Sequence, residues 1–396
     1  MSKNDTNKKA VALHKKLGGK IIISSATKIA RREDMTLVYT PGVAAVSKLL
    51  SSSSSKFEQA KLARDYTIKG KTVAVISDGS AVLGLGNIGP YGALPVMEGK
   101  CALFKTFANV EAFPIVLDTQ DPEKIIEAVA AIAPVFGGIN LEDIAAPKCF
   151  YIEEELKKRL DIPVMHDDQH GTAVVVLAAL INAAKVVKKP ARPGDPSRSG
   201  GDFRNLRVVV SGAGAAGTAS VKLLLKAGVK DIIVLDRKGI ISASRPEAHK
   251  RLLARRTNPR KLSGGLREAI AGADALIGVS GPGLATAEDI KLMAAKAIVF
   301  AMANPVPEIT PEEAKRGGAY VIGTGRSDYP NQINNSLAFP GIFRGALDRR
   351  VRQITDEMKV KAAKNLAALV KRPTAGKIIP GPFDKGVTAA VARAVK

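Results

Sequence analysis

The sequence predicts an α/β protein with two domains, the second built on a doubly wound parallel sheet. Short β-branched runs alternate with helix-length segments along the chain, a pattern typical of parallel sheets. The chain has 396 residues, of which 46% are hydrophobic and 4% aromatic. This length exceeds one ordinary core, and the composition favours aliphatic interiors. We expect domains at residues 1–165 and 166–396, with C-terminal helices that could pack back on the first.

The elements of the first half follow from local signals. Residues 1–35 are expected to form a polar, basic helical arm, and residues 36–44 an extended piece broken at Pro41-Gly42. Asp121 is a typical helix cap and Pro122 suits a first helical position, so a helix should begin there. The expected strands are 71–77, 135–139 and 164–165, and the expected helices are 121–132, 149–159 and 171–187.

The second half begins after a loop rich in Pro, Gly, Arg and Ser at residues 189–201. Three further strands and two helical regions with basic faces are expected beyond the first βαβ unit. The strands are 275–279, 297–301 and 320–322, and the helical regions are 344–370 and 385–395.

A glycine-rich loop follows the β-branched run at residues 208–210. It reads Gly212-x-Gly214-x-x-Gly217, opens a helix, and is followed after nineteen residues by Asp236 at the end of another strand. This order predicts a Rossmann-type dinucleotide site, in which the pyrophosphate lies at the helix N-terminus. Its alternative is a glycine-rich packing turn. The backbone groups expected to contact the cofactor are those of Gly212, Gly214, Ala215, Ala216 and Gly217.

The cofactor itself stays open between NAD and NADP. Asp236 favours NAD, because its carboxylate would accept hydrogen bonds from the ribose hydroxyls. Arg237 and Lys238 follow directly and could hold a 2′-phosphate. A second match to the glycine pattern, Gly84-x-Gly86-x-x-Gly89, precedes Pro90 and lacks the strand context. We interpret it as a turn that shapes the substrate pocket.

Two acidic pairs predict a metal site. Glu142 and Asp143 end one expected strand, and Asp167 and Asp168 end another. Neighbouring side chains on a strand point to opposite faces, so Glu142 and Asp143 can share an ion only if the backbone turns there. Carboxylates without thiolates suit Mg²⁺ or Mn²⁺. The alternative is helix capping and surface ion pairs.

Two histidines, His166 and His170, flank the second acidic pair. They could indicate zinc or iron, but we expect them to be structural or to orient metal ligands. Gly171 argues against a helix that begins before it and would carry both rings on one face.

The charge of the chain is strongly basic, with a formal net charge of +23. The basic residues are dispersed, are not interleaved with aromatics and form no nucleic-acid motif. We interpret them as a solvated surface that attracts anionic ligands, and we expect no specific nucleic-acid partner. Cys101 and Cys149 indicate no disulfide framework. With no signal-peptide pattern and no stretch long enough to span a bilayer, we expect a cytoplasmic protein.

Several motifs together resemble the malic enzyme family in its short bacterial and archaeal form. They lie in family order between residues 39 and 345, which is most of the chain. The matching segments are Tyr39-Thr-Pro-Gly-Val-Ala, Ser77-Asp-Gly-Ser-Ala-Val-Leu-Gly-Leu-Gly-Asn-Ile-Gly, Pro95-Val-Met-Glu-Gly-Lys100, Phe136-Gly-Gly-Ile-Asn-Leu-Glu-Asp, His166-Asp-Asp-Gln-His-Gly-Thr, Ala303-Asn-Pro, and Gly325-Arg-Ser-Asp-Tyr-Pro-Asn-Gln-Ile-Asn-Asn335.

This resemblance implies oxidative decarboxylation of (S)-malate to pyruvate and CO₂, with NAD or NADP and Mg²⁺ or Mn²⁺. It also implies a homodimer or larger homo-oligomer, with a substrate domain preceding the Rossmann-type domain. Lysine can act as a base only if its pKa is lowered, which we expect from burial and nearby cations. By matching positions, Tyr39 is the general acid, Lys100 the general base, Glu142, Asp143 and Asp168 the metal ligands, Asp167 their acidic neighbour, and Asn304 and Asn335 contacts to substrate or nicotinamide.

One departure concerns the distal carboxylate of malate. Large eukaryotic members have Glu-Arg where this chain has Ser80 and Ala81, as in short forms, so Asn304, Asn334 and Asn335 are the candidates for holding it. Two other functions stay open: malolactic-type decarboxylation without net redox change, and a non-catalytic, nucleic-acid-associated binding protein.

Overall fold

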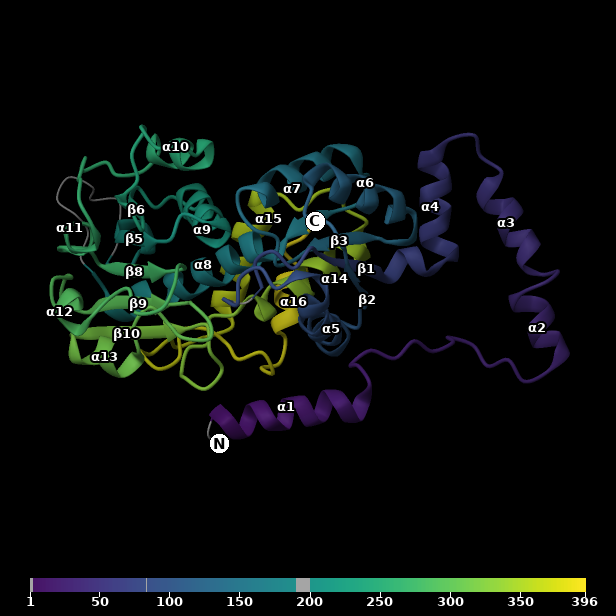
Figure 1. Ribbon diagram of the computed structural model, residues 1–396, viewed down its shortest axis with the longest axis horizontal. Helices are drawn as coiled ribbons and strands as arrows, with labels where there is room; N and C mark the ends of the chain where they lie inside the picture. Colours follow the sequence, from purple (N-terminus) through teal and green to yellow (C-terminus); the bar gives the residue numbers. More distant parts are fainter. Residues whose placement is uncertain (1–2, 83, 190–199) are drawn as a thin grey trace.

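The computed structural model describes residues 3–82, 84–189 and 200–396. It contains two sheets that lie side by side, one parallel and one mainly parallel (Figure 1). The first sheet has the order β2-β1-β3-β4, and all its strands are parallel. Its strands are β1 (Thr72–Ser77), β2 (Glu111–Val116), β3 (Gly138–Leu141) and β4 (Val164–His166).

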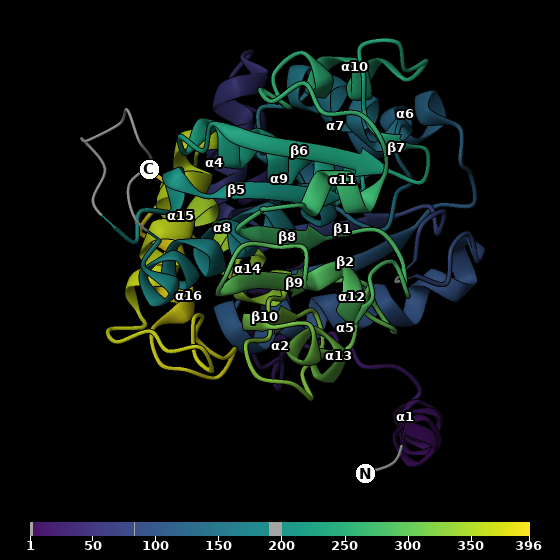
Figure 2. The ribbon, with the colours of Figure 1, turned by 90° about the vertical axis from the view of Figure 1, so that its left-hand side faces the viewer.

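The second sheet has the order β10-β9-β8-β5-β6-β7, in which only β7 is antiparallel among the described strands. Figure 2 shows β6, β5, β8, β9 and β10 in this order from top to bottom. The chain starts at the central β5 and adds strands on both sides, so the predicted fold class is confirmed. The strands are β5 (Arg207–Ser211), β6 (Asp231–Asp236), β7 (Gly239–Ile240), β8 (Ala275–Gly278), β9 (Ala297–Ala301) and β10 (Ala319–Thr324).

Helices cover both faces of the first sheet. Successive residues of β1 alternate between two cores: Val73 and Val75 pack with α5, while Ala74 and Ile76 pack with α6 and α7. Helix α6 begins where predicted, because Asp121 accepts a hydrogen bond from Glu123 N (2.9 Å). The helices are α4 (Lys56–Tyr66), α5 (Gly89–Ala108), α6 (Pro122–Ile132) and α7 (Lys148–Arg159), with 3-10 turns at η1 (Ile68–Lys71) and η2 (Ala133–Val135). The turn η2 occupies part of the strand expected at 135–139, which begins only at Gly138.

The long apolar helix α8 (Asp167–Val187) packs between the two halves of the chain, against α9 (Ala215–Lys226) and α15 (Asp356–Ala368). It begins four residues before Gly171, so the expectation that Gly171 precludes an earlier start is wrong. A Cβ at Gly171 would stand 1.8 Å from Asp167 Oδ1, so the glycine makes room for that carboxylate one turn earlier. Among the described helices, α8 alone is long and apolar enough to cross a membrane, contrary to our expectation, but 78% of that stretch is buried.

The C-terminal helices return to the first sheet. Phe339 and Phe343 of α14 (Phe339–Arg349) contact the Phe104 ring of α5, with centroids 4.7 and 5.5 Å apart. The helical region expected at 344–370 is divided between α14 and α15, because Arg350 adopts a left-handed conformation and ends α14. The boundary predicted after residue 165 falls inside β4 and stays a prediction. The remaining elements are η3 (Phe203–Asn205), α10 (Ala248–Ala254), α11 (Leu266–Ile270), α12 (Ala287–Ile290), α13 (Pro311–Arg316), η4 (Asn335–Leu337) and α16 (Val387–Ala392).

The N-terminal arm extends away from the rest of the molecule (Figure 1). It contains α1 (Lys3–Leu17), α2 (Arg32–Val38) and α3 (Val43–Ser51), and neither α2 nor α3 has a buried residue. The extended piece expected at 36–44 is wrong. Asp34 accepts from Arg31 N (3.0 Å) and starts α2, and the turn around Pro41-Gly42 separates α2 from α3. The helical arm expected at 1–35 is likewise interrupted, because α1 ends at Leu17 and α2 begins only at Arg32.

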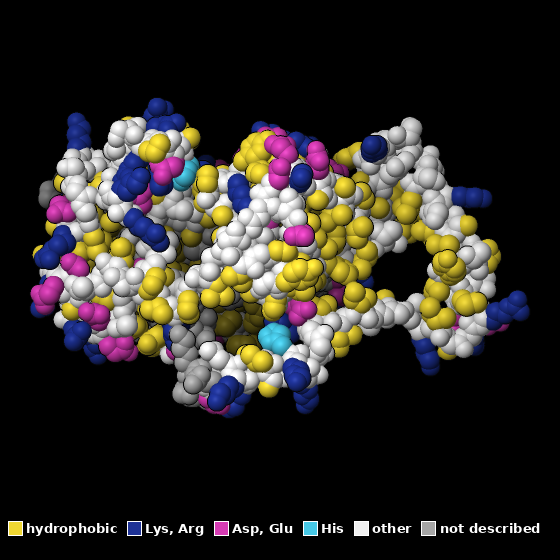
Figure 3. All heavy atoms as spheres, viewed as in Figure 1, with side chains coloured by type: hydrophobic (Ala, Val, Ile, Leu, Met, Phe, Trp, Pro, Cys, Tyr) yellow, Lys and Arg dark blue, Asp and Glu magenta, His cyan; other side chains and the backbone are white. Residues whose placement is uncertain are grey.

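The two cysteines are buried and the basic side chains are dispersed, as the sequence predicts. Cys101 and Cys149 are buried and free, and burial raises the pKa of each thiol to about 12. Lys and Arg side chains are spread over the face drawn in Figure 3 rather than gathered into one patch. The loop expected at 189–201 lies mostly outside the described residues.

Candidate active site

Three carboxylates converge at the carboxyl ends of β3 and β4. Glu142 and Asp143 follow β3, Asp168 lies in the first turn of α8, and each offers an oxygen within 4.8 Å of the others. Asp143 has a φ of +54°, so the backbone turns between the two neighbouring acids, as a shared ion requires. Asp143 N donates to Asp168 Oδ2 (2.8 Å), which ties the two segments together.

The cluster has the donor chemistry of a hard divalent cation. Its ligand atoms are carboxylate oxygens, and Glu142 and Asp143 are buried. Burial raises the pKa of Glu142, and Asp168, Asp167 and Asp143 raise it further against the lowering effect of Lys100. Four carboxylates with one ammonium leave excess negative charge in a buried site. A divalent cation would offset that charge, so these residues fit Mg²⁺ or Mn²⁺.

Lys100 of α5 lies beside these carboxylates. Its side chain is 7% exposed and donates to Glu142 Oε1 and Asp167 Oδ2, and Nζ lies 4.3 Å from the Phe339 ring centroid. Burial lowers its pKa, but Asp167, Glu142 and Asp168 outweigh burial, so the pKa is raised above the usual value. The expectation that the pKa of Lys100 is lowered is therefore wrong. That expectation considered burial and nearby cations but not the adjacent carboxylates, whose effect is larger than that of burial.

The glycine loop between β5 and α9 has the geometry of a dinucleotide cradle. Gly212 has a φ of +120°, and a Cβ there would stand 2.5 Å from Val279 O. A Cβ at Gly217 would stand 1.8 Å from Gly212 O, so helix and loop pack closely only with glycine. At Gly214 a Cβ would meet no described atom within 4 Å. This open side at the N-terminus of α9 could receive a pyrophosphate.

Comparison with known proteins decides the family. Residues 19–157 match the model of the malic enzyme N-terminal domain, and residues 169–396 match that of the malic enzyme NAD binding domain. The chain belongs to the malic enzyme family. The expected family is therefore confirmed, and the fold agrees with it.

Individual members of the malic enzyme family are similar over nearly the whole chain. The bifunctional malic/malolactic enzyme of Bacillus subtilis is 51% identical over 98% of this chain and 91% of its own. The NAD-dependent malic enzyme of Geobacillus stearothermophilus is 54% identical over 96% of this chain and 76% of its own. The crystal structure of the NAD-dependent malic enzyme of Thermotoga maritima is 48% identical, with a TM-score of 0.90 and 98% of both chains covered. Further relatives are named NADP-dependent malic enzymes.

One loop connects the carboxylate cluster with the second sheet. Ala81 N donates to Asp143 O (2.9 Å), and a Cβ at Gly84 would stand 2.1 Å from Asn304 O. The second glycine motif therefore lies between the carboxylate cluster and the Asn304 loop. This placement agrees with its interpretation as a turn near the substrate, and no described contact links it to the cradle at Gly212.

The asparagines expected near the substrate differ in position and in whether their side chains already have a hydrogen-bond partner. Asn335 lies close to the start of α8, since a Cβ at Gly171 would stand 3.1 Å from Asn335 Cβ. Asn334 instead caps η4 by accepting from Ser336 N (2.9 Å), so its carbonyl oxygen already has a structural partner. Asn335 and Asn304 are therefore the better candidates of the three.

A buried carboxylate that we did not predict, Glu153 of α7, fixes the start of α8. It accepts from His166 N (3.0 Å), Gln169 Nε2 (3.1 Å) and His170 Nε2 (3.1 Å). His170 Nδ1 lies 3.0 Å from Lys359 Nζ, and burial lowers the pKa of His170 to about 4. This histidine is thus a neutral structural link. The spacing Cys149, Ile152, Glu153, Leu156 places Glu153 on the buried helix face and was the signal available.

A second unpredicted carboxylate, Glu308, links the loops that follow β8 and β9 in the second sheet. It accepts from Ser280 N and Ala303 N, both at 2.9 Å, and Ala303 precedes Asn304. Sequence offers no signal for it, because its partners are backbone N–H groups, one of them 28 residues away along the chain.

Tyr39 is the expected residue that the fold does not bring to the cluster. It lies at the end of α2 on the extended arm, and its residue exposure is 70%. Figure 1 shows α2 and α3 well away from β3 and α5. Within one chain, Tyr39 is therefore remote from Lys100.

Proposed function

We propose that this protein catalyses the oxidative decarboxylation of (S)-malate to pyruvate and CO₂ with NAD or NADP. The observation that supports it best is the buried Lys100 between Glu142 and Asp167, at a carboxylate cluster that one loop links to the Rossmann-type sheet. The names of the relatives agree with this activity. A nucleic-acid-associated binding protein is not favoured, because binding alone does not require such a cluster.

The residues around the cluster fit the proton movements of this reaction. When bound, a cation held by Glu142, Asp143 and Asp168 would supply Lewis-acid stabilisation of the C2 oxygen, and a nicotinamide would accept the hydride. Lys100 takes the proton of the 2-hydroxyl after passing its own proton to Asp167, with which it is already hydrogen-bonded. Asn335 and Asn304 bind the distal carboxylate or the nicotinamide amide.

Tyr39 acts in a neighbouring copy of the chain. The exposed apolar side chains of its arm, such as Ile22, Leu37 and Val43, suit contact with a second subunit rather than with water. In a symmetric dimer each arm could then place its Tyr39 beside the Lys100 of the partner, where the phenol would protonate the enolate carbon. This arrangement makes the protein a homodimer or a larger even oligomer.

Mixed dimers test this arrangement. Tyr39→Phe and Lys100→Ala subunits, each inactive alone, should recover activity when co-expressed with different tags and purified as heterodimers. If Tyr39 acts across the interface, one of the two sites has both residues, so turnover should reach about half that of the wild-type dimer. If Tyr39 acts within its own chain, both sites are defective and the heterodimer stays inactive. A wild-type heterodimer with the same two tags is the control.

Initial rates with (S)-malate test the function directly. We expect NAD(P)H and pyruvate to form in equal amounts with Mn²⁺ or Mg²⁺, and formation to stop when a chelator removes the cation. Lactate formed without accumulation of NAD(P)H would indicate the malolactic reaction instead. Salt-sensitive binding of DNA with no turnover of malate would contradict the proposal.

A further inference from the structure

Asp236 is already engaged by two basic side chains that sequence reasoning did not single out. At the end of β6, its Oδ1 accepts from Arg245 Nη2 (3.0 Å) and from Lys238 N (2.8 Å), while its Oδ2 lies 2.9 Å from Lys250 Nζ. Side-chain exposure is 15% for Asp236, 11% for Arg245 and 16% for Lys250, so part of each side chain remains accessible to solvent.

This pairing limits what Asp236 can do for a ribose. A carboxylate offers about four acceptor positions, and three of them have donors here. The two adjacent hydroxyls of an NAD ribose would therefore compete with Arg245 or Lys250 for Asp236. A carboxylate reserved for NAD alone has no need of two cations beside it.

The Arg245 and Lys250 side chains are held in place by neighbouring groups, and they keep N–H donors that can bind a further acceptor. Arg245 Nη2 also donates to Gly239 O (3.2 Å), which leaves the Nε and Nη1 hydrogens of its guanidinium for another acceptor. Lys250 is oriented by Glu247 Oε1 (2.6 Å). A planar guanidinium and an ammonium are the two side-chain groups best suited to binding a phosphate.

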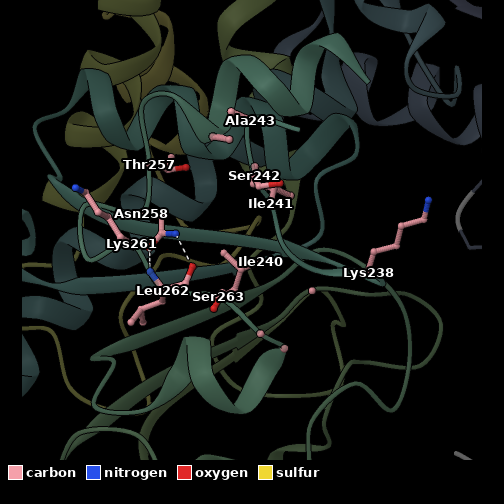
Figure 4. Close-up of a pocket in the computed structure, with 14 residues that line it drawn as sticks. Lys238, Ile240, Ile241, Ser242, Ala243, Thr257, Asn258, Lys261, Leu262 and Ser263 are labelled. Atoms are coloured by element: carbon pink, nitrogen blue, oxygen red, sulfur yellow. Dashed lines mark hydrogen bonds between the residues drawn. The ribbon is translucent and has the colours of Figure 1, made fainter. Parts of the chain in front are cut away.

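The charge around this strand end is positive. Residues 236–250 contain four basic and two acidic side chains. Next to them, a cavity of about 710 Å³ adjoins β7 and is lined by Lys238 and Lys261 and by no carboxylate. Figure 4 shows the Lys238 side chain extending away from the other labelled residues, and the contact of Lys238 with Asp236 is through its backbone. The side chains positioned at the ribose end are thus Arg245 and Lys250.

We propose that Arg245 and Lys250 are specificity-determining residues that bind the 2′-phosphate of NADP. This inference rests on the proposed cofactor site and deepens it. It means that the protein uses NADP as well as NAD although an acid ends β6. Asp236 holds the two cations in position in the free protein and offers one remaining acceptor to a ribose hydroxyl.

Binding of adenosine 2′,5′-bisphosphate and of 5′-AMP, measured by calorimetry, tests this without any turnover of malate. The Arg245→Ala and Lys250→Ala variants should each bind the bisphosphate about tenfold more weakly, while 5′-AMP binding changes less than about threefold. Lys261→Ala removes the same charge from the neighbouring cavity and should change neither. Arg237→Ala tests the competing candidate and should have a smaller effect.

An Asp236→Ala variant should change the affinity for the bisphosphate in the opposite direction to the Arg245 and Lys250 variants. It removes the carboxylate that competes for the two cations, so the bisphosphate should bind more tightly and 5′-AMP more weakly. Equal weakening of both probes in the Arg245 and Lys250 variants would show a structural role and overturn the proposal, as would no change in either probe. Because no malate is present, failure here is distinguishable from failure of the proposed reaction.

Discussion

Replacement of Lys100 by alanine should abolish malate oxidation and leave NAD(P)H binding nearly unchanged. Lys100 donates to Glu142 and Asp167 inside the cluster and is the one ammonium that the described contacts place there. Loss of a positioned general base typically costs about 10²–10⁴-fold in rate. We expect a fall in kcat of this size with saturating malate and cation, measured by NAD(P)H absorbance. Cofactor binding, measured by NAD(P)H fluorescence, should change little, because the glycine cradle lies in the other sheet.

Two further variants distinguish chemistry from folding. Lys105→Ala removes an exposed lysine from the same helix, where it pairs with Glu111, and should keep normal turnover. Lys100→Arg keeps the charge beside the buried carboxylates but is a far weaker base, so it should fold with a normal melting temperature and stay inactive. Near-normal turnover in Lys100→Ala would remove Lys100 from the mechanism.

The Asp168→Asn variant should need a much higher Mn²⁺ concentration for half-maximal activity. Asparagine can still accept the hydrogen bond from Asp143 N, so the backbone turn should persist while one ligand charge is lost. Because affinity for hard cations depends on ligand charge, we expect an increase of about tenfold or more. The measurement is activity against free Mn²⁺, together with Mn²⁺ binding followed by electron paramagnetic resonance.

An exposed acid provides the matched control for this variant. Asp118 follows β2 at the far edge of the same sheet, outside the cluster, and Asp118→Asn should leave Mn²⁺ activation unchanged. Unchanged metal dependence in Asp168→Asn would exclude it as a ligand. A loss of turnover that no Mn²⁺ concentration restores would point to a role beyond metal binding.

Local sequence signals predicted much of the fold. The strand at 297–301 and the helix at 121–132 have the predicted limits, because β-branched runs and an Asp-Pro start act over a few residues. Errors arose where distant groups intervene. Gly171 was expected to begin its helix, but it lies inside α8 to accommodate Asp167. The helix at 32–38 runs past residue 35, where the helical arm was expected to end, because no packed face marks its last residues in the sequence.

The sequence alone determined the family, the two-sheet α/β class and the set of acids and glycines from which a site could be built. These properties reside in short motifs and in hydrophobic periodicity, which depend on neighbouring residues. Tertiary structure alone decided how those groups act on one another. It surrounds Lys100 with carboxylates that raise its pKa, pairs Asp236 with Arg245 and Lys250, and leaves Tyr39 on an arm remote from its own cluster. Electrostatic interaction depends on distance in space, and the order of residues along a chain does not specify that distance.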